Sequence, residues 1–102
     1  MTDFEAKIPT TLEELPTGKV KAWTPPRSPR VITVENDNRG GNPAHRTGTF
    51  QVKLHGRTGW EDEQTLEWEE ALTYEAGGDD FAIRNRGTVV LNLRYQWPLG
   101  VV

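Results

Sequence analysis

The polar and apolar positions divide the chain near residue 30. From residue 31 onward, short segments alternate apolar and polar residues and are separated by turns rich in glycine and asparagine. Alternation over four to eight residues is typical of half-buried β-strands. Residues 1–30 show no sustained apolar period and carry five prolines: Pro9, Pro16, Pro25, Pro26 and Pro29. We therefore predict an extended, proline-rich N-terminal arm over residues 1–30 and a β-domain over residues 31–102.

Four segments of the β-domain have a strand pattern. Val31–Val34 is a run of β-branched residues, which are enriched in strands, and Phe81–Arg84 is a second short strand. Thr49–His55 and Thr88–Trp97 alternate between apolar and polar residues. Thr88–Trp97 has the longest apolar face, so we predict that it lies centrally in a sheet. Short strands with regular turn signals indicate an all-β fold, either a small antiparallel sandwich or a partly closed barrel.

The segment from residue 64 to residue 75 fits two structures. Its Glu, Leu and Ala content favours a helix, which Gly77–Gly78 could end. Four apolar residues nevertheless share one parity, as in a strand: Leu66, Trp68, Leu72 and Tyr74. We predict a strand with a bulge near Glu69–Glu70, and the helix stays the alternative.

The arm itself contains three local patterns. Between Pro9 and Pro16, Thr11 and Glu14 match a capping box, which predicts one short helical turn. Lys19–Trp23 alternates and could pair as an edge strand. The proline-rich residues 24–30 predict a polyproline segment about 20 Å long. Such an arm can lie on its own domain or on a neighbouring subunit, and the sequence leaves both open.

The arm also supplies candidate contacts to a protein partner. Trp23 is an aromatic side chain of the kind that anchors an interface in a pocket. Residues 26–29 form a PxxP tetrad flanked by arginines, nominally a ligand for an SH3-type domain, although a simple spacer is the stronger interpretation. The candidate contacts in the arm are Trp23, Pro25, Pro26, Arg27 and Arg30.

The charge of the chain is segregated. The net charge is −3, and residues 61–80 hold nine acidic residues and no basic one. Runs of like charge are usually solvated faces, but an acidic face can also dock a basic protein. For the second case the candidate contacts are Glu67, Glu69 and Glu75.

Catalytic and metal-binding patterns fail when their chemistry is tested. The chain has no cysteine, and its two histidines, His45 and His55, show no ligand spacing relative to acidic residues. A calcium-like loop starting at Glu35 has Arg39 where an oxygen ligand is required. The only serine, Ser28, lies in the proline-rich spacer, a poor frame for a nucleophile. We predict no enzymatic activity, no cofactor and no metal site.

Nucleic acid and membranes are also unpromising partners. Single-stranded nucleic acid would be attracted by aromatic residues near cations: Trp60, Tyr95 and Trp97 near Lys53, Arg57, Arg84 and Arg94. The net charge is negative, however, and Tyr95 and Trp97 share the parity of the apolar residues of their strand, so they look like core. We expect no signal peptide and no transmembrane segment. The absence of cysteine favours a virion or cytoplasmic location.

These patterns predict a non-enzymatic structural subunit of a larger assembly. The hydrophobic fraction of 34% and the mean hydropathy of −0.69 favour a chain that completes its burial against protein neighbours, which include copies of itself as one option. By analogy, the best match is a decoration or cement protein of a viral (phage) particle, held partly by its arm. The alternative is a small acidic inhibitor or immunity-type protein that covers a basic site with residues 61–80.

Overall fold

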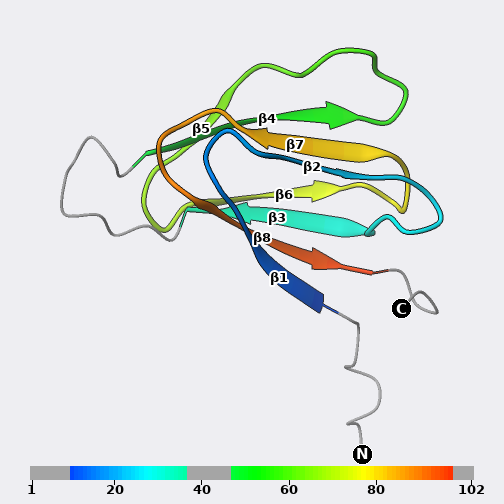
Figure 1. Ribbon diagram of the computed structural model, residues 1–102. Coiled ribbons are helices and arrows are strands. Elements are labelled where there is room, and N and C mark those ends of the chain that lie inside the picture. The colour runs from blue at the N-terminus through cyan, green and yellow to red at the C-terminus, as the bar shows by residue number, and fades with distance from the viewer. Residues whose placement is uncertain (1–9, 37–46, 98–102) are drawn as a thin grey trace, which may run out of the picture.

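Two antiparallel sheets packed face to face form the fold (Figure 1). The computed structural model describes residues 10–36 and 47–97. These residues form eight strands: β1 (Thr10–Leu15), β2 (Val20–Trp23), β3 (Val31–Glu35), β4 (Gly48–Leu54), β5 (Gln64–Leu66), β6 (Ala71–Glu75), β7 (Phe81–Asn85) and β8 (Leu91–Gln96). Sheet A has the strand order β1-β8-β3-β6, and sheet B has the order β2-β7-β4-β5. The predicted all-β class is confirmed, in its sandwich form.

The strands pair as nested partners. The first strand pairs with the last, and the same rule continues inward through β2–β7, β3–β6 and β4–β5. Successive pairs alternate between the two sheets. This order is that of an eight-stranded jelly roll, an architecture in which a long antiparallel ribbon is folded over onto itself.

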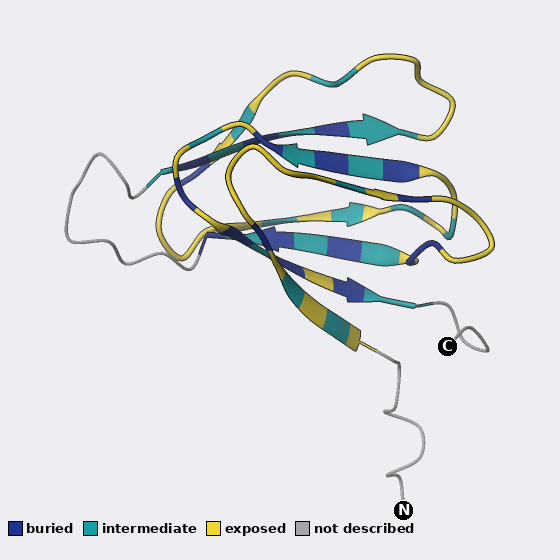
Figure 2. Cartoon of the chain, in the orientation of Figure 1, coloured by how far each residue is buried: buried dark blue, intermediate teal, exposed yellow. Residues whose placement is uncertain are grey.

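The core lies between the sheets and follows the alternation of the strands (Figure 2). In β8, Leu91 and Leu93 are fully buried and Tyr95 is almost so, while Arg94 between them is exposed. The strand lies between β1 and β3, which confirms the predicted central position, although it begins at Leu91 rather than Thr88. The predicted strands near residues 31–34, 49–55 and 81–84 are also present, as β3, β4 and β7.

Residues 10–30 are built into the sandwich, so the predicted arm is wrong for this part of the chain. The expected helical turn is the edge strand β1, whereas the edge strand expected at Lys19–Trp23 is confirmed as β2. Leu15 and Trp23 are buried in the core. The polyproline segment is also wrong at its start, because the Arg27 N–H donates to the Thr24 carbonyl and closes a tight turn. Residues 1–9 lie outside the described part.

The segment from residue 64 to residue 75 is extended, but it is not one strand. β5 belongs to sheet B and β6 to sheet A, so the chain crosses between the layers at residues 67–70. Glu69 has a φ of 72°, in the left-handed region that allows a tight reversal. The predicted strand character is confirmed, and the single bulged strand is wrong because the break is a change of sheet.

Candidate functional site

The predicted anchor Trp23 is a core residue. Its side chain is 6% exposed and packs between Tyr95, with ring centroids 5.1 Å apart, and Phe81, at 6.1 Å. A ring held in this way is not available to a partner's pocket, because binding would require opening the sandwich. The sequence argument failed because Trp23 has few apolar neighbours in sequence, whereas its neighbours in space come from β7 and β8.

The other predicted contacts of the arm lie on the surface at one end of the sandwich. Pro25, Pro26 and Arg27 are exposed in the turn after β2. Arg30 is exposed as well, and its guanidinium lies 3.3 Å from the Gln96 side-chain oxygen. These four residues therefore remain accessible to a partner, whereas Trp23 does not.

The predicted acidic contacts are spread along the β5–β6 side. Glu67 and Glu69 lie in the crossing between the sheets, and Glu75 ends β6; all three are exposed. At about 3.3 Å per strand residue, Glu75 is roughly 16 Å from Glu70. Part of the crossing is committed to structure, since the Glu67 N–H donates to the Glu70 carboxylate at 2.7 Å. The carboxylates thus form a line rather than one compact patch.

A second cluster lies on the outer face of sheet B. We call Gln51, Lys53, Trp60 and Arg84 the Trp60 cluster. Gln51 and Lys53 occupy outward positions of β4, and Arg84 stands opposite Gln51 on β7. The chain returning from β4 runs back along that strand, because the Glu61 N–H donates to the Val52 carbonyl at 2.8 Å. This return places Trp60 over the sheet, with Arg84 4.4 Å and Lys53 5.0 Å from its ring centroid.

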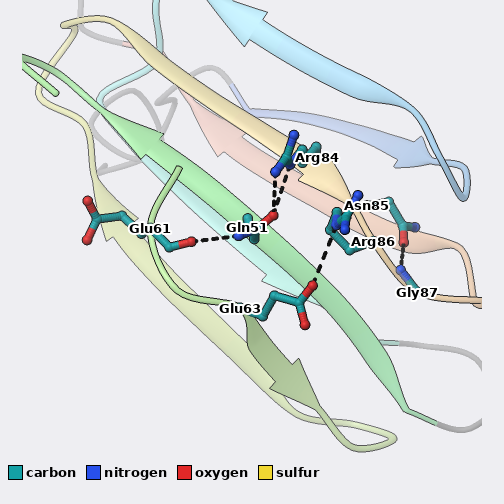
Figure 3. Close-up of polar contacts among 7 residues, drawn as sticks. All are labelled: Gln51, Glu61, Glu63, Arg84, Asn85, Arg86 and Gly87. Atoms are coloured by element: carbon teal, nitrogen blue, oxygen red, sulfur yellow. Dashed lines mark hydrogen bonds and ion pairs between the residues drawn. The ribbon is translucent and has the colours of Figure 1, made fainter. Parts of the chain in front are cut away.

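Hydrogen bonds fix the polar side chains of this face (Figure 3). The Arg84 Nε and Nη2 atoms donate to the Gln51 side-chain oxygen at 3.0 and 2.7 Å. The Gln51 amide in turn donates to the Glu61 carbonyl at 2.9 Å, and Arg86 lies 3.5 Å from Glu63. The Trp60 cluster therefore holds the β4–β5 connection onto the sheet, with its cations and aromatic ring on the outer face of sheet B.

The structure brings together three of the residues considered for nucleic acid. Lys53 on β4 and Arg84 on β7 both lie against the ring of Trp60, which is in the β4–β5 connection. Tyr95 is buried, and Trp97 is half-buried against it at 5.4 Å, which confirms that these two rings belong to the core region. Of the three aromatic residues considered for nucleic acid, Trp60 is the one that lies on the outer face of sheet B.

Two shallow clefts lie at the end of the sandwich beside this face. One, of about 230 Å³, is lined by the cations Lys53 and Arg57 together with Asp80. The other, of about 340 Å³, includes His55, which lies 3.7 Å from Asp80. Within residues 10–36 and 47–97, no three His, Asp or Glu side chains are grouped to hold a metal ion.

The serine considered as a nucleophile, Ser28, is fully buried, and its hydroxyl donates to the Asp79 carbonyl.

Polar residues join the two sheets on the β1–β2 side. We call Glu13, Lys21 and Tyr95 the Glu13 lock. Lys21 Nζ lies 3.3 Å from the Glu13 carboxylate, which also accepts a hydrogen bond from the Tyr95 hydroxyl. Burial, and then the neighbouring Glu13, raises the pKa of Tyr95 well above its usual value of 10. Sequence reasoning missed this group because Glu13 and Tyr95 are 82 residues apart.

Comparisons with protein-family models, curated proteins and solved structures found no match for this chain. In the described part of the chain there is no helix whose length and apolar character would let it cross a membrane.

Proposed function

We propose that the protein is a non-enzymatic structural subunit of a larger assembly, as a decoration or cement protein of a viral (phage) particle is. The observation that carries the proposal is the strand order, because the eight-stranded jelly roll is an architecture shared by many viral capsid domains. Lectin and cupin domains share it too, so the support is an analogy of fold.

The two polar clusters stabilise the sandwich itself. The Trp60 cluster and the Glu13 lock each hold one part of the chain against another. Attachment then depends on the sheet faces, the strand edges, residues 1–9 and the exposed residues Pro25, Pro26, Arg27 and Arg30, since β1 and β2 belong to the sandwich. Many weak contacts of this kind add up when a subunit is held at several places in a symmetric particle.

Fractionation of the native source tests this proposal. Particles are separated on a density gradient, and the chain is quantified in every fraction with an antibody against the purified protein. We expect it to sediment with a multi-megadalton particle in many copies per particle, and to remain there after a high-salt wash. Recovery of the chain only as a free small protein, or in a one-to-one complex, would contradict the proposal.

A second candidate function is inhibition of a protein with a basic site. The observation in its favour is the exposure of Glu67, Glu69 and Glu75 along one side of the sandwich. Acidic surfaces accelerate association with basic partners, and salt weakens the effect. Changing all three to Gln should slow association and flatten its salt dependence, whereas Glu14→Gln, an exposed acid on β1 outside residues 61–80, should change little. Binding indifferent to both salt and substitution would remove this candidate.

A further inference from the structure

Among the described strands, the outer side of β1 is an open strand edge at Leu12. β1 ends sheet A, and no other described strand pairs with its outer side (Figure 1). Leu12, in the middle of β1, is 63% exposed, more than any other large hydrophobic residue of the described chain. Unpaired edges with an apolar side chain favour strand addition, and many proteins protect such edges with lysine or proline. The six residues of β1 contain neither, and the one charged side chain among its exposed positions is Glu14.

The pairing pattern shows which backbone groups face this open side. The Asn36 N–H donates to Glu70, on the β6 side, so the alternate residue Glu35 directs its backbone groups toward β8. Glu35 stands opposite Asn92, whose groups therefore face β3, while those of its neighbour Leu93 face β1. Leu93 stands opposite Glu13. Glu13 therefore bonds inward to β8, and the N–H and C=O of Leu12 point outward, away from the sheet.

We propose that this edge binds a second copy of the chain, β1 against β1, around a two-fold axis at Leu12. The two Leu12 residues then exchange both of their backbone hydrogen bonds, as a hydrogen-bonded antiparallel pair does. Sheet A continues across the axis into the sheet of the second copy. A closed two-fold contact uses the same surface on both chains and does not propagate into a fibre.

The sequence of β1 is complementary to itself in this register. Residues opposite each other in an antiparallel pair lie on the same face, so a register must match outward with outward positions. Centring on Leu12 places the two Leu12 side chains together on the outer face and Thr11 opposite Glu13 of the second copy. Centring on Glu13 instead would place the two Glu13 carboxylates face to face, and like charges directly opposite are destabilising.

Charge and size define how strong the pairing is. Each copy has a net charge of −3, so the two copies repel at long range and salt weakens that repulsion. One strand pairing is a small contact, below the roughly 1,200 Å² at which stable interfaces begin. We therefore expect a dimer that dissociates on dilution and strengthens with salt. This inference goes beyond the proposed function, because it concerns the free chain with no other component present.

Sedimentation velocity of the full chain, from about 1 μM to 1 mM, tests the pairing at two salt concentrations. We expect the mass to rise from one chain to two over this range. Leu12→Pro removes the outward N–H without removing a bond to β8, and Leu12→Lys places two positive charges together at the axis. Both should weaken the dimer at least tenfold. Ala71→Lys, an exposed position on β6 at the opposite edge of sheet A, is the matched control and should dimerise like the unchanged chain.

Three outcomes would overturn the inference. The unchanged chain could remain monomeric throughout the series. It could dimerise equally well with Leu12→Pro, provided that circular dichroism shows that variant to be folded, in which case another surface makes the dimer. Finally, only a chain lacking residues 1–9 could dimerise, which would mean that those residues cover the edge in the full chain. Hydrogen exchange gives an independent readout, since the Leu12 amide should become protected as concentration rises.

Discussion

Polar side chains link the two sheets at both lateral sides of the sandwich, but the linking residues differ between the two sides. On the β1–β2 side, the Glu13 lock joins the sheets from within, and Leu12 and Val20 are exposed outside. On the β5–β6 side, buried Asn36 joins them. Its side chain donates to the Leu66 carbonyl at 2.9 Å, and its backbone bonds Glu69 and Glu70. The outer surface on that side is acidic.

Linking the two sheets and protecting an edge strand from further pairing are therefore separate properties of each side. Both sides hold the layers together, but among the described residues the β5–β6 side carries more exposed carboxylates than the β1–β2 side, and these discourage further pairing with acidic strands. On the β1–β2 side, Lys21 and Glu13 link the two sheets at a partly exposed margin. The exposed positions of β1 are Thr10, Leu12 and Glu14, so this edge carries one large apolar side chain and one carboxylate. The exposed Leu12 makes it the better candidate for contact with another chain.

Removing the whole β1–β2 side should have the largest effect. A chain that begins at residue 31 lacks one edge strand of each sheet, together with the buried Leu15 and Trp23. We expect it to lose cooperative thermal unfolding, measured by circular dichroism. The matched control begins at residue 10 and should keep a cooperative transition. A sharp transition in the shorter chain would show instead that residues 31–102 fold independently.

One tryptophan on each side allows the contributions of the two sides to stability to be compared directly. Trp23→Ala empties a site in the core and should lower the free energy of unfolding by about 3–5 kcal/mol. Trp68→Ala, at the β5–β6 crossing where the side chain is 39% exposed, should lower it by less than about 1 kcal/mol. Urea unfolding of both variants measures the difference. Equal losses would mean that the two sides depend on their aromatic residues to the same extent.

The fall in the free energy of unfolding at alkaline pH tests the contribution of the Glu13 lock to stability. Near pH 10 tyrosine in the unfolded chain begins to ionise, whereas Tyr95 in the folded protein has a raised pKa and stays protonated. The folded state then binds more protons, so stability falls as the pH rises above about 10. Tyr95→Phe should reduce this fall, and at pH 7 it should cost about 1–2 kcal/mol through the lost hydrogen bond to Glu13.

Tyr74→Phe is the comparison for this experiment, because burial alone raises the pKa of Tyr74 and no Glu13 is involved. It should reduce the alkaline loss less than Tyr95→Phe does. An unchanged pH dependence in Tyr95→Phe would contradict the contribution of Tyr95 to stability at high pH.

The smallest effect is expected on the acidic side. Replacing Glu67, Glu69 and Glu75 by Gln should change the free energy of unfolding by no more than about 1 kcal/mol, because exposed charges contribute little. Urea midpoints at low and high salt measure this. A loss of several kcal/mol would show that these carboxylates belong to the structure of the crossing rather than to its surface.

The central strands could be predicted from the sequence because their signal is local. In β4 and β8, apolar side chains at every second position face the core, so the alternation itself records which face is buried. The candidate site was less accessible. The exposed arm residues and carboxylates were found from composition, but the role given to Trp23 was wrong, and the contact between Trp60 and Arg84 depends on the chain returning along β4.

The sequence by itself determined the β-class, the inner strands and most of the core, since each follows from alternation or from β-branched residues within a few positions. Only the tertiary structure decided that residues 10–15 form a strand of the fold. The inward positions Thr11 and Glu13 are polar, and they are satisfied by Trp97 and Tyr95 from the other end of the chain. It also decided that residues 64–75 divide between two sheets, because parity specifies which side chains point inward but not which layer a strand joins.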